Sequence, residues 1–179
     1  MAKTQLHNYS VQEKLNKMDI DVIQVEQTLI DAASTPVAGD IMFTEITIPD
    51  AVAVEGGTCM IHSITALLSD NAAIASSDGA NLNQSFRIIF SNDDTSLGAL
   101  DAAIGDIIIG RSDLVGIQGF TDMVAVQDLG RNALFAKTSI GIVAKAKAGS
   151  RDLYITGISQ SDDDYNGGTI TLNIGIIKD

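Results

Sequence analysis

Short runs of alternating apolar and polar residues recur between Ile20 and Lys178, separated by turn residues such as Gly, Asn and Asp. A period of two places successive side chains on opposite faces of a β-strand. The predicted strands are Ile20–Ile30, Asp40–Pro49, Thr58–Leu68, Gln84–Phe90, Phe120–Gln127, Ala133–Ala146, Leu153–Ser159 and Thr169–Ile177. Their spacing predicts an all-β chain with one β-sandwich or barrel, jelly-roll-like in type.

Strict alternation also predicts which side chains share a face. In the fourth run, Phe86, Ile88 and Phe90 point the same way. In the third run, one predicted face is Cys59, Ile61, Ser63, Thr65 and Leu67, and the other is Met60, His62, Ile64, Ala66 and Leu68. We expect this third strand to be buried on both sides for part of its length.

Two segments depart from the strand pattern. Met1–Met18 is polar and shows only a weak helical spacing of apolar residues, so we interpret residues 1–18 as an N-terminal arm and residues 19–179 as one domain. Three interpretations of the arm stay open: it is disordered, it caps the domain, or it lies across a neighbouring subunit. For Leu97–Ile109 we expect at most one short helix, beginning near Thr95.

Composition limits the class of protein. A chain of 179 residues is long enough for one well-buried domain, and with no Trp and only 4% aromatic residues we expect an aliphatic core. The single cysteine, Cys59, excludes an internal disulfide and any four-cysteine metal site. No apolar run approaches the roughly 18 residues of a membrane span, so we expect a soluble protein.

The charges are numerous and segregated. A net charge of −12 disfavours binding to nucleic acid or to an anionic membrane surface. Asp19–Phe86 contains ten acidic residues and no Lys or Arg, whereas Leu129–Arg151 contains five basic residues and no acid. The two segments are therefore expected to attract each other, either within one chain or between protomers of an oligomer.

The sequence offers little for catalysis. His7 lies in the arm, and His62 lies in an apolar strand, where a structural histidine is the simpler interpretation. Cys59 is an odd number of residues from His62, so the two are expected on opposite faces rather than as a nucleophile and base. We predict that the chain is not an enzyme.

No metal or cofactor site is predicted either. Asp162–Asp164 is the densest acidic cluster, but it lacks the alternating spacing of a calcium-binding loop and fits the tip of a hairpin. The glycines at 105, 110, 116 and 119 do not form a dinucleotide-binding pattern and are interpreted as turns and bulges.

Basic residues supply the candidate contact sites. Lys145 and Lys147 alternate and are expected on the same side of a strand, in a stripe too short for nucleic acid and suited to a cross-strand or interface role. Lys3, Lys14 and Lys17 give the arm its positive charge. We predict that these five lysines contact a protein partner.

Three segments together resemble a known family. Val37–Asp40 before a strand, the run Phe86–Ser91, and Asp152–Ile158 before a final acidic hairpin are similar to tailed-bacteriophage head decoration, or cement, proteins. The resemblance spans Val22–Asp179, and the segment before Asp19 has no counterpart. It implies a compact β-sandwich or barrel, commonly a homotrimer, that binds the major capsid protein on the outer surface of the shell and stabilises it.

The expected function is therefore that of a bacteriophage virion structural protein, made in the host cytoplasm and located on the outer capsid surface. Its expected partners are the major capsid protein and further copies of itself, with neither nucleic acid nor membrane. The alternatives are a phage tail or baseplate component, a carbohydrate-binding or adhesive β module, and a hydrolase. The lack of Trp argues against sugar stacking, and the missing nucleophile and base argue against hydrolysis.

Overall fold

The structure is a computed structural model that describes residues 20–28, 38–69, 85–94, 97–99, 117–128, 132–160 and 168–178. Its strands are β1 (Ile20–Thr28), β2 (Ile41–Ile48), β3 (Thr58–Ser69), β4 (Ser85–Ser91), β5 (Ile117–Asp128), β6 (Asn132–Lys145), β7 (Leu153–Ser159) and β8 (Thr169–Lys178). Each predicted strand is confirmed to within a few residues at its ends. The predicted arm, residues 1–18, lies outside the described residues.

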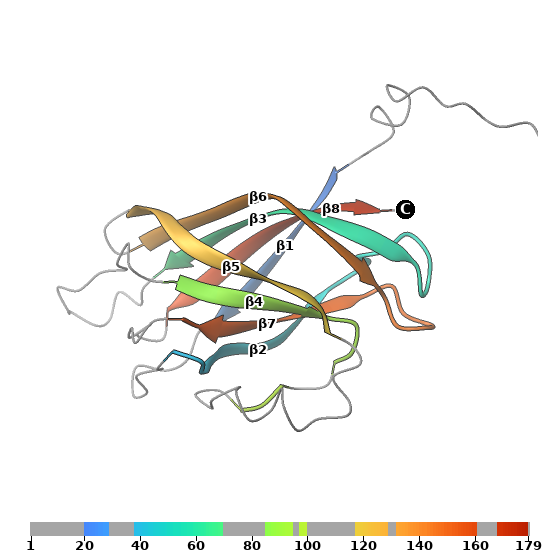
Figure 1. The fold of residues 1–179 in the computed structure, drawn as a ribbon, viewed down its shortest axis with the longest axis horizontal. Coiled ribbons are helices and arrows are strands. Elements are labelled where there is room, and N and C mark those ends of the chain that lie inside the picture. Colours follow the sequence, from blue (N-terminus) through green and yellow to red (C-terminus); the bar gives the residue numbers. More distant parts are fainter. Residues whose placement is uncertain are drawn as a thin grey trace, which may run out of the picture.

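The strands are antiparallel and follow the order β1-β8-β3-β6-β5-β4-β7-β2. Strand β5 pairs with β4 over Ile117–Val124 and with β6 over Ala125–Asp128, so the sheet divides at β5 into two layers. One layer is β1-β8-β3-β6 and the other is β5-β4-β7-β2 (Figure 1). This interleaved order is the double Greek key of a jelly roll, which confirms the predicted β-sandwich.

The core lies between the two layers. Strand β8 shows why, because its residues at even positions from Ile170 to Ile176 are fully buried while Thr171 and Asn173 between them are only half-buried. Most core residues are aliphatic, as the composition predicts. The largest buried side chains also include four phenylalanines, namely Phe43, Phe86, Phe90 and Phe135.

The predicted faces of β4 are confirmed, since Phe86, Ile88 and Phe90 all enter the core. The predicted faces of β3 are wrong beyond Ile61. There the register of β3 shifts against both β6 and β8, because a β-bulge inserts one residue before Ser63. The buried side chains of β3 are therefore Cys59, Ile61, Ile64, Ala66 and Leu68.

Strand β6 accommodates the same irregularity with positive backbone angles, φ 57° at Ser139 and φ 70° at Gly141. Of the segment expected to contain a short helix, residues 97–99 have no regular structure, and the rest lies outside the described residues. There Leu97 packs against Ile41, Ile89 and Ile158 in a small second apolar cluster. No described helix is long and apolar enough to cross a membrane.

Candidate functional site

One end of the sandwich is built from two loops joined by backbone hydrogen bonds: residues 49–57 between β2 and β3, and residues 146–152 between β6 and β7. The bonds run from Val52 N to Arg151 O (3.1 Å), from Gly56 N to Ser150 O (2.8 Å) and from Ala146 N to Gly57 O (3.0 Å). Paired backbones of this kind hold the loop side chains in fixed positions, as a contact surface requires.

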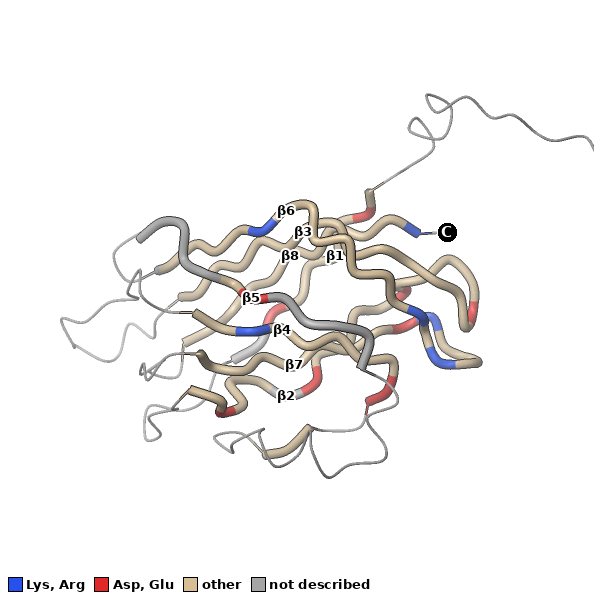
Figure 2. Tube along the Cα trace, in the orientation of Figure 1, with Lys and Arg blue, Asp and Glu red and all other residues tan. Residues whose placement is uncertain are grey.

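Charged side chains gather on these loops and on the adjoining end of β4, where Figure 2 shows acidic and basic residues close together. We call this surface the charged end. Its members are Asp50, Asp93, Lys145, Lys147, Arg151 and Asp152.

An ion pair links the two loops. The Arg151 guanidinium contacts the Asp50 carboxylate, and the Asp50 backbone N–H donates a hydrogen bond of 2.9 Å to Oδ1 of Asp152. Asp50 has a positive φ of 50°, which Asp tolerates better than most residues. The pair joins the acidic segment to the basic segment within one chain. It therefore supports the intrachain interpretation of the charge pattern, while pairing between protomers stays a prediction.

A second ion pair connects β4 to the same end. Lys147 Nζ donates to Oδ2 of Asp93 at 2.9 Å, and the hydroxyl of Ser91 donates to the Asp93 carbonyl at 2.9 Å. The hydrogen bond from its ammonium to Asp93 raises the pKa of Lys147, and the negative charge of Asp93 adds to the effect. Lys147 therefore stays charged across the physiological range.

The phenol of Tyr154 is partly buried and is influenced by several of the carboxylates at this end. Burial is the main cause that raises the pKa of its phenol, and the carboxylates of Asp94, Asp152 and Asp93 raise it further because they disfavour a phenolate. The phenol is thus held protonated beside a group of acids. The charged end can therefore make paired electrostatic contacts with a partner, with lysines and an arginine set among carboxylates.

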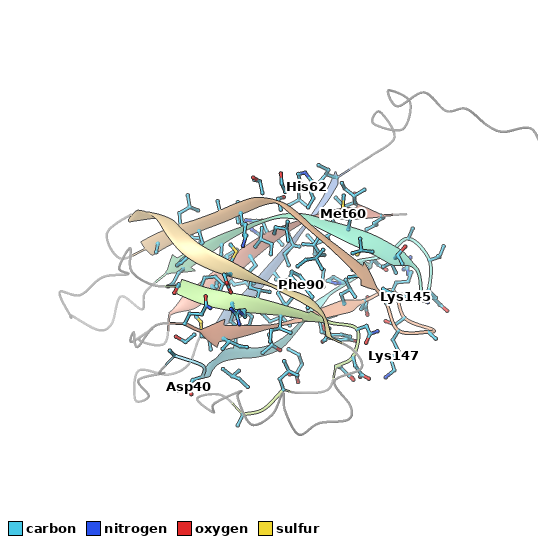
Figure 3. All side chains as sticks on the ribbon, viewed as in Figure 1. Asp40, Met60, His62, Phe90, Lys145 and Lys147 are labelled. Carbon is cyan, nitrogen blue, oxygen red and sulfur yellow. The ribbon has the colours of Figure 1, made fainter. Side chains whose placement is uncertain are left out.

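The predicted contact residues fall partly on this surface. Lys145 and Lys147 are both exposed, whereas Ala144 and Ala146 are buried, and both lysines lie at the charged end (Figure 3). The alternation of burial is as predicted, but Lys147 lies in the loop after β6 and not on a strand, and contact with a partner stays a prediction. The predicted contacts at Lys3, Lys14 and Lys17 lie outside the described residues, as does Asp162–Asp164.

The remaining sequence candidates are separated by the structure. Cys59 is buried in the core, whereas His62 is half-buried on the outer face of β3, so they lie on opposite faces as predicted. Within the described ranges, His, Cys, Asp and Glu form no group of three or more that would hold a metal ion. The acidic and basic partners at the charged end come from loops far apart in sequence, which is why residue spacing alone did not reveal them.

A second charged group lies in the middle of the sheet, across β4, β5 and β6. Arg87 Nε donates to Oδ1 of Asp122 at 2.7 Å and its Nη2 to Oδ2 at 3.4 Å, while Lys137 Nζ donates to the Asp122 carbonyl at 3.0 Å. The hydrogen bond from Arg87 lowers the pKa of Asp122, against an opposing effect of burial. Each side chain of the Arg87–Asp122 pair is more than a third exposed, so solvent screens it.

This pair gives a pH-dependent prediction. Because the pKa of Asp122 is lower in the folded chain than its ordinary 3.8, the carboxylate adds stability above that pH, and this contribution is lost as the pH falls through the lowered value. Asp122→Asn is expected to lower the free energy of unfolding by less than about 1 kcal/mol at neutral pH. In urea denaturation, the difference in free energy of unfolding between the variant and the unaltered protein should become smaller as the pH is lowered.

The matched control for that experiment is the double variant Asp122→Asn with Arg87→Met. If the pair acts as described, Asp122→Asn has a smaller cost in the Arg87→Met background than alone. A cost of the same size at all pH values, or in both backgrounds, would contradict the assignment.

Comparisons with known proteins add little. No protein-family model and no curated protein sequence matches the chain. Among solved structures, a chain in the crystal structure of tomato aspermy virus matches with a TM-score of 0.35 and 9% sequence identity, over 88% of this chain and 77% of that chain. Similarity at this level assigns no function, and the resemblance to head decoration proteins stays a prediction.

Proposed function

We propose that the chain is a non-enzymatic virion structural protein, and specifically a head decoration protein that binds the outer surface of a major capsid shell and stabilises it. The observation that supports this most is the strand order β1-β8-β3-β6 and β5-β4-β7-β2. That double Greek key occurs in viral capsid and lectin domains. The step from fold to function is an analogy, and the charged end gives it a testable surface.

The charged end is proposed as the surface that contacts the capsid. Its loops are held by backbone bonds, so binding would cost little ordering of the chain. Lys145 and Lys147 are exposed there, on a chain that is acidic overall. These lysines could orient the protein on a partner, because acidic residues of the partner would be attracted to Lys145 and Lys147 and repelled by the acidic remainder of the chain.

The test is cosedimentation of the purified protein with capsid shells that lack it. We expect saturable binding at a fixed ratio to the major capsid protein, weakened by added salt, because salt screens exposed charges. The double variant Lys145→Glu with Lys147→Glu should bind more weakly. The control is Lys137→Glu, which reverses an exposed lysine of β6 outside the charged end.

Equal binding by both variants would remove the charged end from the contact. Failure of the unaltered protein to sediment with any shell would contradict the decoration proposal itself. Binding in a parallel glycan panel would then favour the carbohydrate-binding alternative.

A further inference from the structure

The described strands leave several open edges. Strand β1 pairs only with β8 and β2 only with β7, so each forms the edge of one layer. Two further edges arise where β5 leaves β6, on the first half of β5 and on the second half of β6. An open edge presents backbone N–H and C=O groups that can pair with a further strand, and proteins usually block such edges.

All of these edges except that of β1 are blocked. Strand β2 is broken by two register shifts against β7 and is followed at once by Pro49. The second half of β6 carries two lysines and passes through positive φ at Ser139 and Gly141. On the first half of β5, the Asp122 carbonyl accepts a hydrogen bond from Lys137. Bulges, lysines and proline are devices that keep an edge from pairing.

The edge of β1 has none of these devices. Its residues, Ile20–Thr28, pair with β8 without a register shift and include no Lys, Arg, Gly or Pro. Three of its polar side chains bond to β8, namely Asp21 to Lys178 (2.6 Å), Gln24 to Asn173 (3.1 Å) and Glu26 to Thr171 (3.3 Å). Both acids of β1 therefore bond to its paired side, and the open edge is straight.

The same strand exposes apolar side chains. Val22 is 67% exposed and Ile20 is 46% exposed. Both lie on the outer face, because the alternate positions Ile23 and Val25 pack against the core. Val22 lies opposite Gly175 of β8, which has no side chain to cover it. Neighbouring exposed apolar residues on an open strand mark a contact surface.

We propose that β1 pairs antiparallel with β1 of a second copy of the chain, so that the β1-β8-β3-β6 layer continues from one protomer into the next. Backbone hydrogen bonds give such a strand addition its affinity, and alternate side chains give it specificity. An antiparallel pair of identical strands has a two-fold axis, so the product is a dimer. The trimer implied by the family resemblance has no two-fold axis and would use a different surface. This proposal concerns association of copies and holds whether or not the protein binds a capsid.

The exposed side chains of β1 match those of its own copy. With the two-fold axis at Val22, this residue lies opposite its counterpart in the second copy, and Ile20 of each copy lies opposite Gln24 of the other. The most exposed large apolar side chain in the described part of the chain is then covered by an apolar side chain. The overlap, Ile20–Gln24, has the usual length of a strand. A second copy therefore supplies a straight strand with an apolar residue at the matching position.

Charge favours this register over its neighbours. An axis midway between Ile23 and Gln24 would place Asp21 opposite Glu26 of the second copy, and like charges directly opposite each other destabilise a sheet. An axis at Gln24 would place the apolar Val22 opposite the Glu26 carboxylate. With the axis at Val22, no acid of β1 lies opposite another.

Cysteine cross-linking tests both the contact and its register. In Val22→Cys the axis brings the two cysteines opposite each other, at a spacing that a disulfide spans. We expect oxidation to form a covalent dimer about tenfold faster with Val22→Cys than with Val54→Cys, because pairing raises the effective concentration of the two thiols. Val54 is a matched control, since it is 64% exposed but lies in the loop of residues 49–57. The native Cys59 is buried, and the unaltered chain serves as the blank.

Gln24→Cys is the control for register. Position 24 is exposed on the same face of β1, but its two cysteines would lie four residues, or about 14 Å, apart along the strands. A disulfide cannot span that distance. Gln24→Cys should therefore cross-link as slowly as Val54→Cys.

Sedimentation equilibrium of the unaltered chain measures the association without a cross-link. We expect a monomer–dimer equilibrium, because a contact of this size is weak. Added salt should raise the dimer fraction, since two copies that each carry a net charge of −12 repel each other. Val22→Lys should lower the dimer fraction, because two ammonium groups would lie opposite each other on the axis. Val54→Lys makes the same change in net charge and should not lower it.

Equal rates of cross-linking in Val22→Cys and Val54→Cys would overturn the proposal, and so would a faster reaction of Gln24→Cys than of Val22→Cys. A chain that stays monomeric at about 1 mM would also overturn it. The same holds for a dimer that Val22→Lys leaves unchanged, because another surface would then join the two copies.

Discussion

Replacing Phe135 with alanine is expected to lower the free energy of unfolding by about 3 to 5 kcal/mol. Phe135 of β6 is fully buried and packs edge-to-face against Phe86 of β4, with ring centroids 4.9 Å apart. The two rings come from different layers, so their contact joins the halves of the sandwich. Domains of this kind are stable by only about 5 to 15 kcal/mol, so the loss would be a large part of the total.

Urea denaturation followed by circular dichroism measures this effect. The control is Thr138→Ala, at an exposed position on the same strand, which is expected to change stability by less than about 0.5 kcal/mol. A cost below about 1 kcal/mol for Phe135→Ala would show that the ring is not at the centre of the core.

Replacing Gly157 with alanine is expected to lower the free energy of unfolding by about 2 to 3 kcal/mol, although the change adds a single methyl group. Gly157 of β7 is the ladder partner of Phe43 in β2, and the Phe43 ring lies directly over it. A β-carbon at Gly157 would overlap three carbons of that ring. The ring is fully buried, so it has no free space into which to move.

Two controls isolate this clash in thermal or urea unfolding. Gly175→Ala on β8 would place its methyl against the Ser63 hydroxyl, which can rotate away, so its cost should be smaller. Phe43→Leu shortens the overlapping side chain, so Gly157→Ala should cost less in that background than alone. Equal costs in both backgrounds would contradict the close packing of Phe43 on Gly157.

The sequence predicted the strands well because each half-buried strand carries its own period-two pattern. Leu153–Ser159 was predicted at its observed bounds, and the buried face of β4 was predicted correctly. Those features depend on residues near each other in the chain. Local patterns therefore sufficed for fold class and for strand positions.

The sequence-based predictions failed where the pairing of a strand with its neighbours determines which side chains face the core. The bulge in β3 between Ile61 and Ser63 reverses which residues face the core, and no Gly or Pro marks it in that strand. The paired strand β6 is irregular at the same level, with positive φ at Ser139 and Gly141. A one-residue shift of this kind changes every later face assignment.

At the charged end, too, features set by neighbouring residues were predictable, and contacts between distant residues were not. The shared exposure of Lys145 and Lys147 was predictable from their alternation with two alanines. The pairing of Lys147 with Asp93 was not, because it joins loops 54 residues apart.

The central claim is that this chain is a structural component of a virion shell. The most direct measurement is its copy number in purified particles of the source virus, by quantitative mass spectrometry against the major capsid protein. The account predicts a ratio near one copy per copy of the major capsid protein, as a protein covering the whole shell requires. A handful of copies per particle would instead indicate a tail or vertex component and contradict the decoration role, and complete absence from the particles would contradict a virion role altogether.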